Sequence, residues 1–126
     1  MKKSIVILIL SCIVIAGVGL TGCYKDIIAG NDPDGAPQFV SFNADLVPIF
    51  SANCALSGCH APGGHSPDLS ADKAYKSLNN GVYVNTLIPK QSKLYAMING
   101  EMSNYIPSPV NKKKVYDWIR NGAPNN

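Results

Sequence analysis

Hydrophobic residues follow two different patterns along this 126-residue chain. Near the N-terminus they form a continuous run over residues 5–16, interrupted only by Ser11 and Cys12. After residue 45 they form short groups at helical spacing, and residues that favour helix ends flank each group. These groups predict helices over residues 46–50, 74–78, 94–98 and 112–120. The second pattern therefore predicts an all-α domain of three to five short helices joined by long loops.

The residues that flank these groups predict where each helix begins and ends. Pro48 falls in the first turn of the first helix, where its missing N–H is tolerated. Gly100 and Gly122 stand at the stop positions of the last two helices. Residues 82–84 favour a short strand, for which the sequence offers no partner. The expected N-caps are, in chain order, Asp45, either Ser70 or Asp72, Ser92, and Asn111.

The N-terminal run has the character of an export signal. Lys2 and Lys3 precede it, and small residues over 17–22 follow it. The run is too short for a bilayer-spanning helix, which needs about 20 apolar residues. Residues 1–22 are therefore predicted to be a signal peptide, which implies an exported protein.

The tetrad Leu20-Thr21-Gly22-Cys23 resembles the bacterial lipobox. The resemblance implies that Cys23 becomes the acylated first residue of a lipoprotein, anchored in a membrane of the bacterial cell envelope on its exported side. The tetrad is compatible with anchoring in either the inner or the outer membrane. The alternative is an uncleaved signal anchor in which Cys23 is incidental.

Composition divides the rest of the chain into a tether and one domain. Residues 24–41 are rich in Gly, Asp, Asn and Pro and lack any apolar period, so residues 23–41 are expected to be a lipidated cysteine and a flexible tether. Residues 42–126 are expected to form one folded domain. The net charge of +3 falls to +1 without Lys2 and Lys3, which does not favour nucleic acid as a partner.

A domain of this size with short helices buries little apolar area, so a disulfide, a metal or a cofactor is expected to stabilise it. Of the four cysteines, Cys12 leaves with the signal and Cys23 is assigned to lipid, so Cys54 and Cys59 remain as a pair. His60 follows directly. Two thiols and an adjacent histidine form the arrangement used for covalent attachment of c-type haem. The usual spacing of two residues is lengthened here to four, and Gly58 makes the extra backbone excursion easier.

Several segments together resemble the small single-haem cytochrome c domains of bacterial exported proteins. The matching segments are 47–54, 59–64, 69–70, 74–78, 92–95 and 118–123. The resemblance implies a class-I cytochrome c-like fold around one covalent haem c, with the first and last helices crossed near Phe50 and Trp118. It also implies that Cys54 and Cys59 hold the haem and that His60 is the proximal iron ligand.

The sequence departs from that family at the distal iron ligand. Ile106 stands where a methionine before proline is expected, and isoleucine cannot bind iron. Met102 is the first choice for the distal ligand, while Met97 is expected to pack in the core. His65 is a third choice. With no distal ligand the iron would be five-coordinate, and the domain would bind gas or peroxide rather than only carry electrons.

Other interpretations of the cysteine pair stay open. Cys54 and Cys59 can form a disulfide in an oxidising compartment. Zinc bound by both thiols, His60 and His65 has the right ligand types but awkward geometry. Thiol redox catalysis usually needs two intervening residues at a helix N-terminus. The lysine run 112–114 is expected to be a solvated face, with a docking patch for an acidic redox partner as the alternative.

The expected function is electron transfer by a membrane-anchored, exported single-haem domain that is not an enzyme and that meets redox protein partners in the cell envelope. The alternative is a haem-free envelope lipoprotein, in which a disulfide stabilises a binding or scaffold module.

Overall fold

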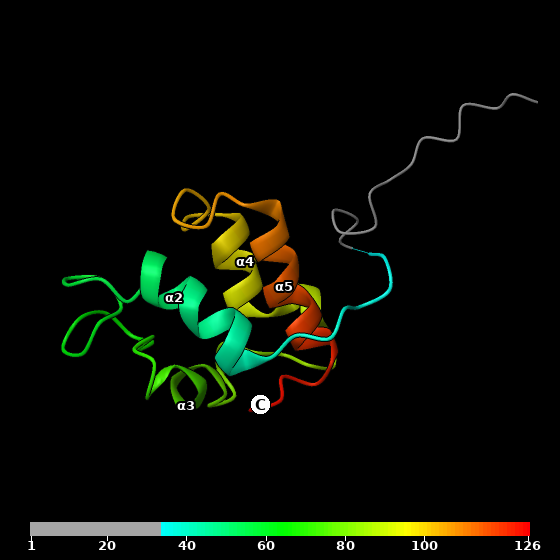
Figure 1. Cartoon of the computed structure of the whole chain (residues 1–126), viewed down its shortest axis with the longest axis horizontal. Helices are drawn as coiled ribbons and strands as arrows, with labels where there is room; N and C mark the ends of the chain where they lie inside the picture. Colours follow the sequence, from blue (N-terminus) through cyan, green and yellow to red (C-terminus); the bar gives the residue numbers. More distant parts are fainter. Residues whose placement is uncertain (1–33) are drawn as a thin grey trace, which may run out of the picture.

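The computed structural model describes residues 34–126. The predicted signal peptide, Cys23 and the first part of the predicted tether lie outside the described residues. The described chain contains helices and loops without a strand, which confirms the predicted all-α class (Figure 1). None of the helices in residues 34–126 is long and apolar enough to cross a membrane. In chain order the elements are η1 (Phe42–Leu46), α2 (Val47–Asn53), α3 (Ala74–Leu78), η2 (Pro89–Gln91), α4 (Lys93–Asn99) and α5 (Pro109–Arg120).

The first helix begins earlier than the sequence predicts. A π-helical turn, η1, leads directly into α2, and Ser41 caps it by accepting a hydrogen bond from the Ala44 N–H at 3.2 Å. Asp45 is not the cap: its carboxylate reaches back and accepts from the Ser41 N–H at 3.0 Å. The two side chains thus satisfy N–H groups at the start of the helix reciprocally. Pro48 falls in the first turn of α2, as predicted.

The last helix, α5, also begins before its predicted start. Ser108, rather than Asn111, is the cap, and its hydroxyl accepts from the Asn111 N–H at 3.4 Å. Pro109 occupies the first helical position, where a missing N–H costs nothing. At the other end Gly122 adopts a φ of +90°, and the Ala123 N–H bonds back to the Trp118 carbonyl at 2.9 Å. The predicted stop at Gly122 is therefore confirmed.

The two middle helices lie close to their predicted ranges. Lys73, rather than Ser70 or Asp72, precedes α3, and no side chain caps this helix; the Ser70 backbone carbonyl accepts from the Ala74 N–H at 2.8 Å. Ser92 precedes α4 as predicted, but its hydroxyl accepts from the Asn85 N–H at 2.8 Å instead of capping the helix. Within the described residues, 82–84 form no strand.

Aromatic rings join the first and last helices in the core. Phe42 is fully buried, and its ring centroid lies 5.1 Å from that of Trp118 and 6.3 Å from that of Phe50. The Tyr75 ring meets Phe42 edge-on at 5.2 Å. Phe50 and Trp118 thus belong to the same core cluster, and the Phe42 ring contacts both of them. Such pairs add to the stability that burial provides.

The end of the predicted tether packs on the domain. The Gln38 N–H donates to the Asp117 carboxylate at 3.2 Å, and the Asn121 side chain donates to the Gln38 carbonyl at 2.7 Å. Arg120 donates to the Gly35 carbonyl at 2.7 Å. Val40 is buried in the core cluster. Residues 35–40 therefore run along the C-terminal part of α5 (Figure 1).

The lysine run in α5 is not a uniform surface. Lys113 is buried and lies 2.7 Å from Asp117, which is also buried. Lys114 forms an ion pair with Asp45 at 2.7 Å. Of these three lysines, Lys112 is half-buried and forms no ion pair within the described residues. The run is therefore neither a wholly solvated face nor a patch of three accessible charges.

Candidate functional site

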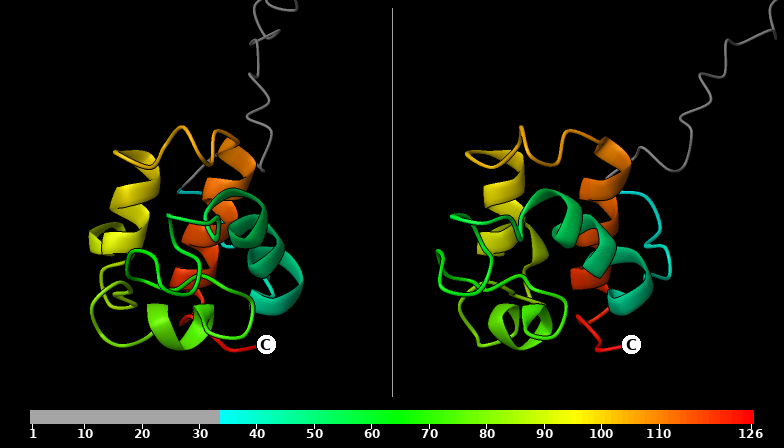
Figure 2. Two further views of the ribbon diagram at one scale, coloured as in Figure 1. Left: turned by 90° about the vertical axis from the view of Figure 1, so that its left-hand side faces the viewer. Right: turned by 60° about the vertical axis from the view of Figure 1, so that its left-hand side comes forward.

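A cavity of about 470 Å³ lies beside the loop that follows α2. Its lining residues come largely from that loop, from α4 and from the loop after α4. Figure 2 shows how these segments are arranged in the domain. Apolar side chains such as Phe50, Leu69, Leu94 and Ile98 line much of it. The cavity also brings together the described residues that the sequence predicts as haem or metal ligands, namely Cys54, Cys59, His60, His65 and Met102, and it adds Met97, which was expected in the core.

The loop between the two cysteines is closed by backbone hydrogen bonds. Cys54 follows the last residue of α2, and its carbonyl accepts from the His60 N–H at 3.1 Å. The Cys59 N–H donates to the Leu56 carbonyl at 2.9 Å. Gly58 has a φ of +79°, so the lengthened loop does place glycine where a left-handed backbone is needed. Both thiols are half-buried and free.

Burial raises the pKa of the Cys54 thiol to about 11, and the nearby Cys59 thiol adds to this shift. Removing the thiol from water disfavours its charged form. Cys54 is therefore protonated at neutral pH, whereas a cysteine that acts as a nucleophile has a lowered pKa. This environment does not favour thiol redox catalysis.

The imidazole of His60 is held in one orientation. Its Nδ1 lies 3.0 Å from the Pro67 carbonyl oxygen and 3.1 Å from the His65 carbonyl oxygen. Because both partners can only accept, Nδ1 is the donor, and in the neutral ring Nε2 is then the nitrogen that carries the lone pair. A histidine that binds a metal is usually oriented by such a bond from its other ring nitrogen.

The segment that supplies these carbonyl groups folds tightly against the cysteine loop. The His65 N–H donates to the Cys59 carbonyl at 2.6 Å, and the Leu69 N–H donates to the His60 carbonyl at 2.8 Å. Gly64 lies so close to the Cys59 carbonyl oxygen that a Cβ atom at this position would overlap with it. Neither Gly64 nor Pro67 could be identified from the sequence, because a close backbone approach and a backbone carbonyl acceptor leave no signal in residue type or spacing.

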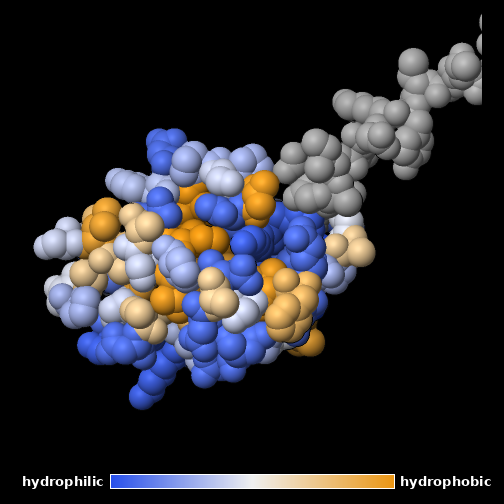
Figure 3. Space-filling model, viewed as in Figure 1, coloured by the Kyte–Doolittle hydropathy of each residue, from blue (hydrophilic) through white to orange (hydrophobic). Residues whose placement is uncertain are grey.

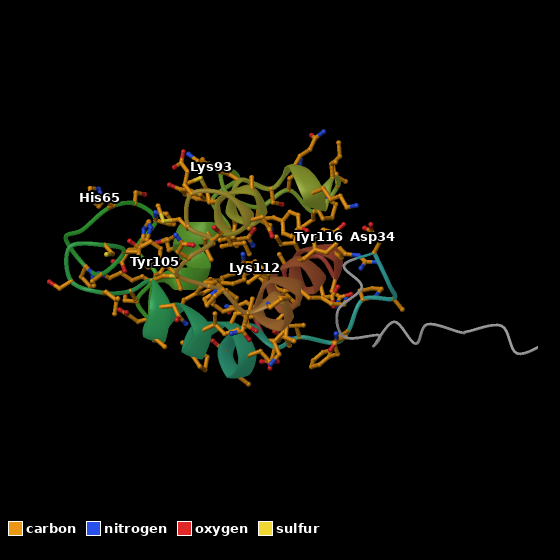
Figure 4. The ribbon with its side chains drawn as sticks, turned by 90° about the horizontal axis from the view of Figure 1, so that it is seen from above. Asp34, His65, Lys93, Tyr105, Lys112 and Tyr116 are labelled. Atoms are coloured by element: carbon orange, nitrogen blue, oxygen red, sulfur yellow. The ribbon has the colours of Figure 1, made fainter. Side chains whose placement is uncertain are left out.

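The loop after α4 contributes the two methionines. Met97 lies in the last turn of α4, Met102 lies in the loop, and both are half-buried on the cavity wall. The prediction that Met97 packs in the core is wrong, because it does not belong to the buried core cluster. Ile106 is buried there instead, with 1% of its surface exposed. The side chain of His65 is exposed at the edge of the cavity (Figure 4).

Polar groups gather in one part of the otherwise apolar cavity. The hydroxyl groups of Ser66 and Tyr83 lie 3.3 Å apart. The ammonium group of Lys93 lies 5.3 Å from the centre of the Tyr83 ring, within the range of a cation–π contact. Together they offer one positive charge and two hydroxyl donors, a combination that suits a carboxylate. The sequence analysis did not find this group, since its members come from three separate segments.

The donor set and the cavity fit a haem. The cavity has the volume of a small-molecule site, and Cys54, Cys59 and His60 contribute two thiols and one imidazole to its lining. Within residues 34–126, no cluster of three or more His, Cys, Asp or Glu side chains is placed to hold a metal ion. The four predicted zinc ligands are thus not assembled around one point.

No protein-family model matches the chain, and comparisons with curated proteins and with solved structures found no match either. The cavity and its donor set are therefore the observations that bear on function.

Proposed function

We propose that residues 42–126 are a single-haem c-type cytochrome domain that transfers electrons on the exported side of a bacterial cell envelope. A lipid on Cys23 would anchor it there. The observation that carries this proposal is the state of His60: its Nδ1 is tied to the Pro67 carbonyl, so that Nε2 remains available, and the ring lies beside two free thiols in one cavity.

Each residue of the motif would have a distinct role. The thiols of Cys54 and Cys59 would each add across a vinyl group, with the sulfur bonding one carbon and the proton going to the other, so no oxidant or reductant is consumed. The structure supports this role because both thiols are unbonded. His60 Nε2 and a methionine, Met102 first, would hold the iron. The bound haem would supply the reversible one-electron change between ferric and ferrous iron.

The cavity walls would tune and protect the site. Leu94 and Ile98 exclude water from one wall, and a low dielectric together with thioether ligation raises a reduction potential. Lys93 and the Tyr83 hydroxyl group lie in the polar part, where they would receive the haem carboxylates.

Redox protein partners would dock where the cavity opens. Leu56 and Tyr105 are 45% and 52% exposed, and the loops that carry them border the cavity. Figure 3 shows hydrophobic side chains reaching the surface among hydrophilic ones on the face that Figure 1 presents. Small mixed surfaces of this kind suit transient encounters. The lysine run of α5 contributes little to docking, because Lys113 is buried.

The test is to produce the full chain in a bacterial host that assembles c-type cytochromes. The expected product is red, with sharp absorption bands in the reduced state and haem that survives extraction with acidified acetone. His60→Ala is expected to abolish the low-spin spectrum. His65→Ala is the matched control, because it removes an exposed imidazole from the same loop, and it should leave the spectrum unchanged.

A folded, colourless protein with a Cys54–Cys59 disulfide would overturn the proposal and favour the haem-free scaffold lipoprotein. A red protein whose ferric iron binds cyanide at once would instead indicate an open distal position, and with it gas or peroxide chemistry.

A further inference from the structure

Two thioether side chains, rather than one, line the cavity wall that lies apart from the cysteine loop. Met97 ends the apolar face of α4, and Met102 follows five residues later. The Met102 N–H donates to the Met97 carbonyl at 2.9 Å, so the chain turns back on itself directly after the helix. This turn brings both residues to the same cavity.

Neither methionine serves as ordinary core filler. The core residues of α4 are Leu94 and Ile98, which are 7% and 4% exposed. Met97 and Met102 are both half-buried and stand outside the buried core cluster. A methionine that fills a gap in a core would be enclosed on all sides. These two are covered by the protein on one side and face the cavity on the other.

Backbone hydrogen bonds hold the turn in place, while the side chains of Met97 and Met102 keep their rotational freedom. The Ser103 N–H donates to the Gly100 carbonyl at 3.0 Å, and the Tyr105 N–H donates to the Met102 carbonyl at 3.1 Å. Ile106 is anchored in the core just beyond this turn. Methionine has three rotatable side-chain bonds and a soft, polarisable sulfur. Each sulfur can therefore reach into the same cavity while the turn stays in place.

We propose that Met97 and Met102 form a pair of interchangeable thioether ligands, either of which can occupy the iron position opposite His60. This proposal rests on the proposed function, because it needs haem in the cavity. It also gives the pair a role: loss or oxidation of one sulfur leaves the other to close the position. A closed position keeps the domain an electron carrier and excludes peroxide and diatomic gases.

The experiment compares Met97→Leu, Met102→Leu and the double variant in the full-length, haem-loaded protein. Leucine keeps the volume and the apolar character of methionine, so folding is preserved. The measurement is the near-infrared sulfur-to-iron band of the oxidised protein. Both single variants are expected to retain the band, and the double variant is expected to lose it and to bind cyanide faster than either single variant. Tyr105→Phe, in the same loop but without a sulfur, is the control and should retain the band.

Loss of the band in Met102→Leu alone would overturn the pair and leave Met102 as a dedicated ligand. Loss in Met97→Leu alone would overturn it in favour of Met97, and a band that persists in the double variant would exclude both. In each of these cases the haem is still attached, so the proposed function survives. A protein without haem would instead overturn both proposals.

Proton NMR of the reduced wild-type protein provides a second test that needs no variant. A ligated methionine methyl group lies under the porphyrin ring current and is strongly shifted upfield. Two such methyl signals in exchange would support the pair, whereas a single sharp signal that does not exchange would contradict it.

Discussion

Gly64→Ala gives a sharp test of how the cysteine loop is built. The φ angle of Gly64 is not in the left-handed region, so alanine is allowed there by the backbone. On that ground alone the substitution would stabilise the protein by about 0.4–1 kcal/mol, because alanine restricts the unfolded chain. The structure predicts the opposite sign. A Cβ atom would overlap with the Cys59 carbonyl oxygen and would lie 3.1 Å from the Ala61 carbonyl oxygen.

The stability loss of Gly64→Ala can be estimated from the contacts that the new Cβ atom would disrupt. Pushing the loop away from Cys59 is an overpacking change, which costs about 1–3 kcal/mol. The same movement breaks the 2.6 Å bond from the His65 N–H to the Cys59 carbonyl, which is worth about 1 kcal/mol. These costs add to about 2–4 kcal/mol, and subtracting the gain from the restricted unfolded chain leaves a net loss of about 1–3.5 kcal/mol. With a urea dependence of about 2 kcal/mol per molar, the unfolding midpoint falls by about 0.5–1.8 M.

Urea unfolding of the two proteins in the same haem state is the assay, and Gly81→Ala is the control. Gly81 has a φ of +85° and open space around its Cβ position, so alanine there costs about 1–2 kcal/mol from backbone strain alone. Only Gly64→Ala should also disturb the haem spectrum, because its loop carries the acceptors of His60. A Gly64→Ala protein as stable as the wild type would refute the close approach.

Three further outcomes are expected. Asp117→Asn should lower the free energy of unfolding by about 3–5 kcal/mol in urea titrations, because it leaves Lys113 buried without its ion-pair partner. Lys113→Met should lower this free energy less, since Asp117 keeps its ion pair with Arg120. Equal losses in the two variants would contradict this reasoning. The free energy of unfolding should fall as the pH drops below about 4, because Lys114 and the Ser41 N–H lower the pKa of Asp45, and their stabilising interactions are lost when this carboxylate is protonated. Unfolding of Asp45→Asn should depend less on acid pH than unfolding of the wild type. An unchanged pH dependence in Asp45→Asn would argue against the ion pair of Asp45 and Lys114. In protein made without haem, Cys54 should react with iodoacetamide about 100-fold more slowly at pH 7 than an unperturbed cysteine, because its pKa is raised to about 11. Mass spectrometry of the labelled peptide measures the rate, and fast labelling would show that the thiol is not shielded.

The helices could be predicted from the sequence because apolar spacing and end signals act locally. The stop at Gly122 is an example, since only the neighbouring backbone decides it. The starts of the first and last helices were misplaced by one turn or nearly so. Ser41 and Ser108 cap these helices, and a π-helical turn or a proline follows each of them. Asp45 and Asn111 are equally good caps by type, so composition alone could not choose between the candidates.

The docking of residues 35–40 could not be predicted, because it depends on groups far along the chain. A segment rich in glycine, aspartate and proline is typical of a coil. Its backbone is nevertheless held by Asp117, Arg120 and Asn121, whose positions are known only once α5 is in place.

Only those parts of the candidate site that depend on side-chain type could be predicted from the sequence. Cys54, Cys59 and His60 were named from their spacing and Met102 from the family resemblance, and the structure places all four at one cavity, while their roles remain predictions. The carbonyl of Pro67 that orients His60 was not foreseeable, because any residue has a carbonyl group. The apolar pattern of α4 put Met97 on the inner face of the helix but could not show whether core or cavity lies there.

Mass spectrometry of the full chain matured in a host that assembles c-type cytochromes tests the central claim most directly. The protein is expected to carry the mass of one haem, located by peptide mapping to the segment between Cys54 and His60. A Cys54→Ser, Cys59→Ser double variant should lack this mass. A mature wild-type protein without added mass, with Cys54 and Cys59 joined to each other, would contradict the account.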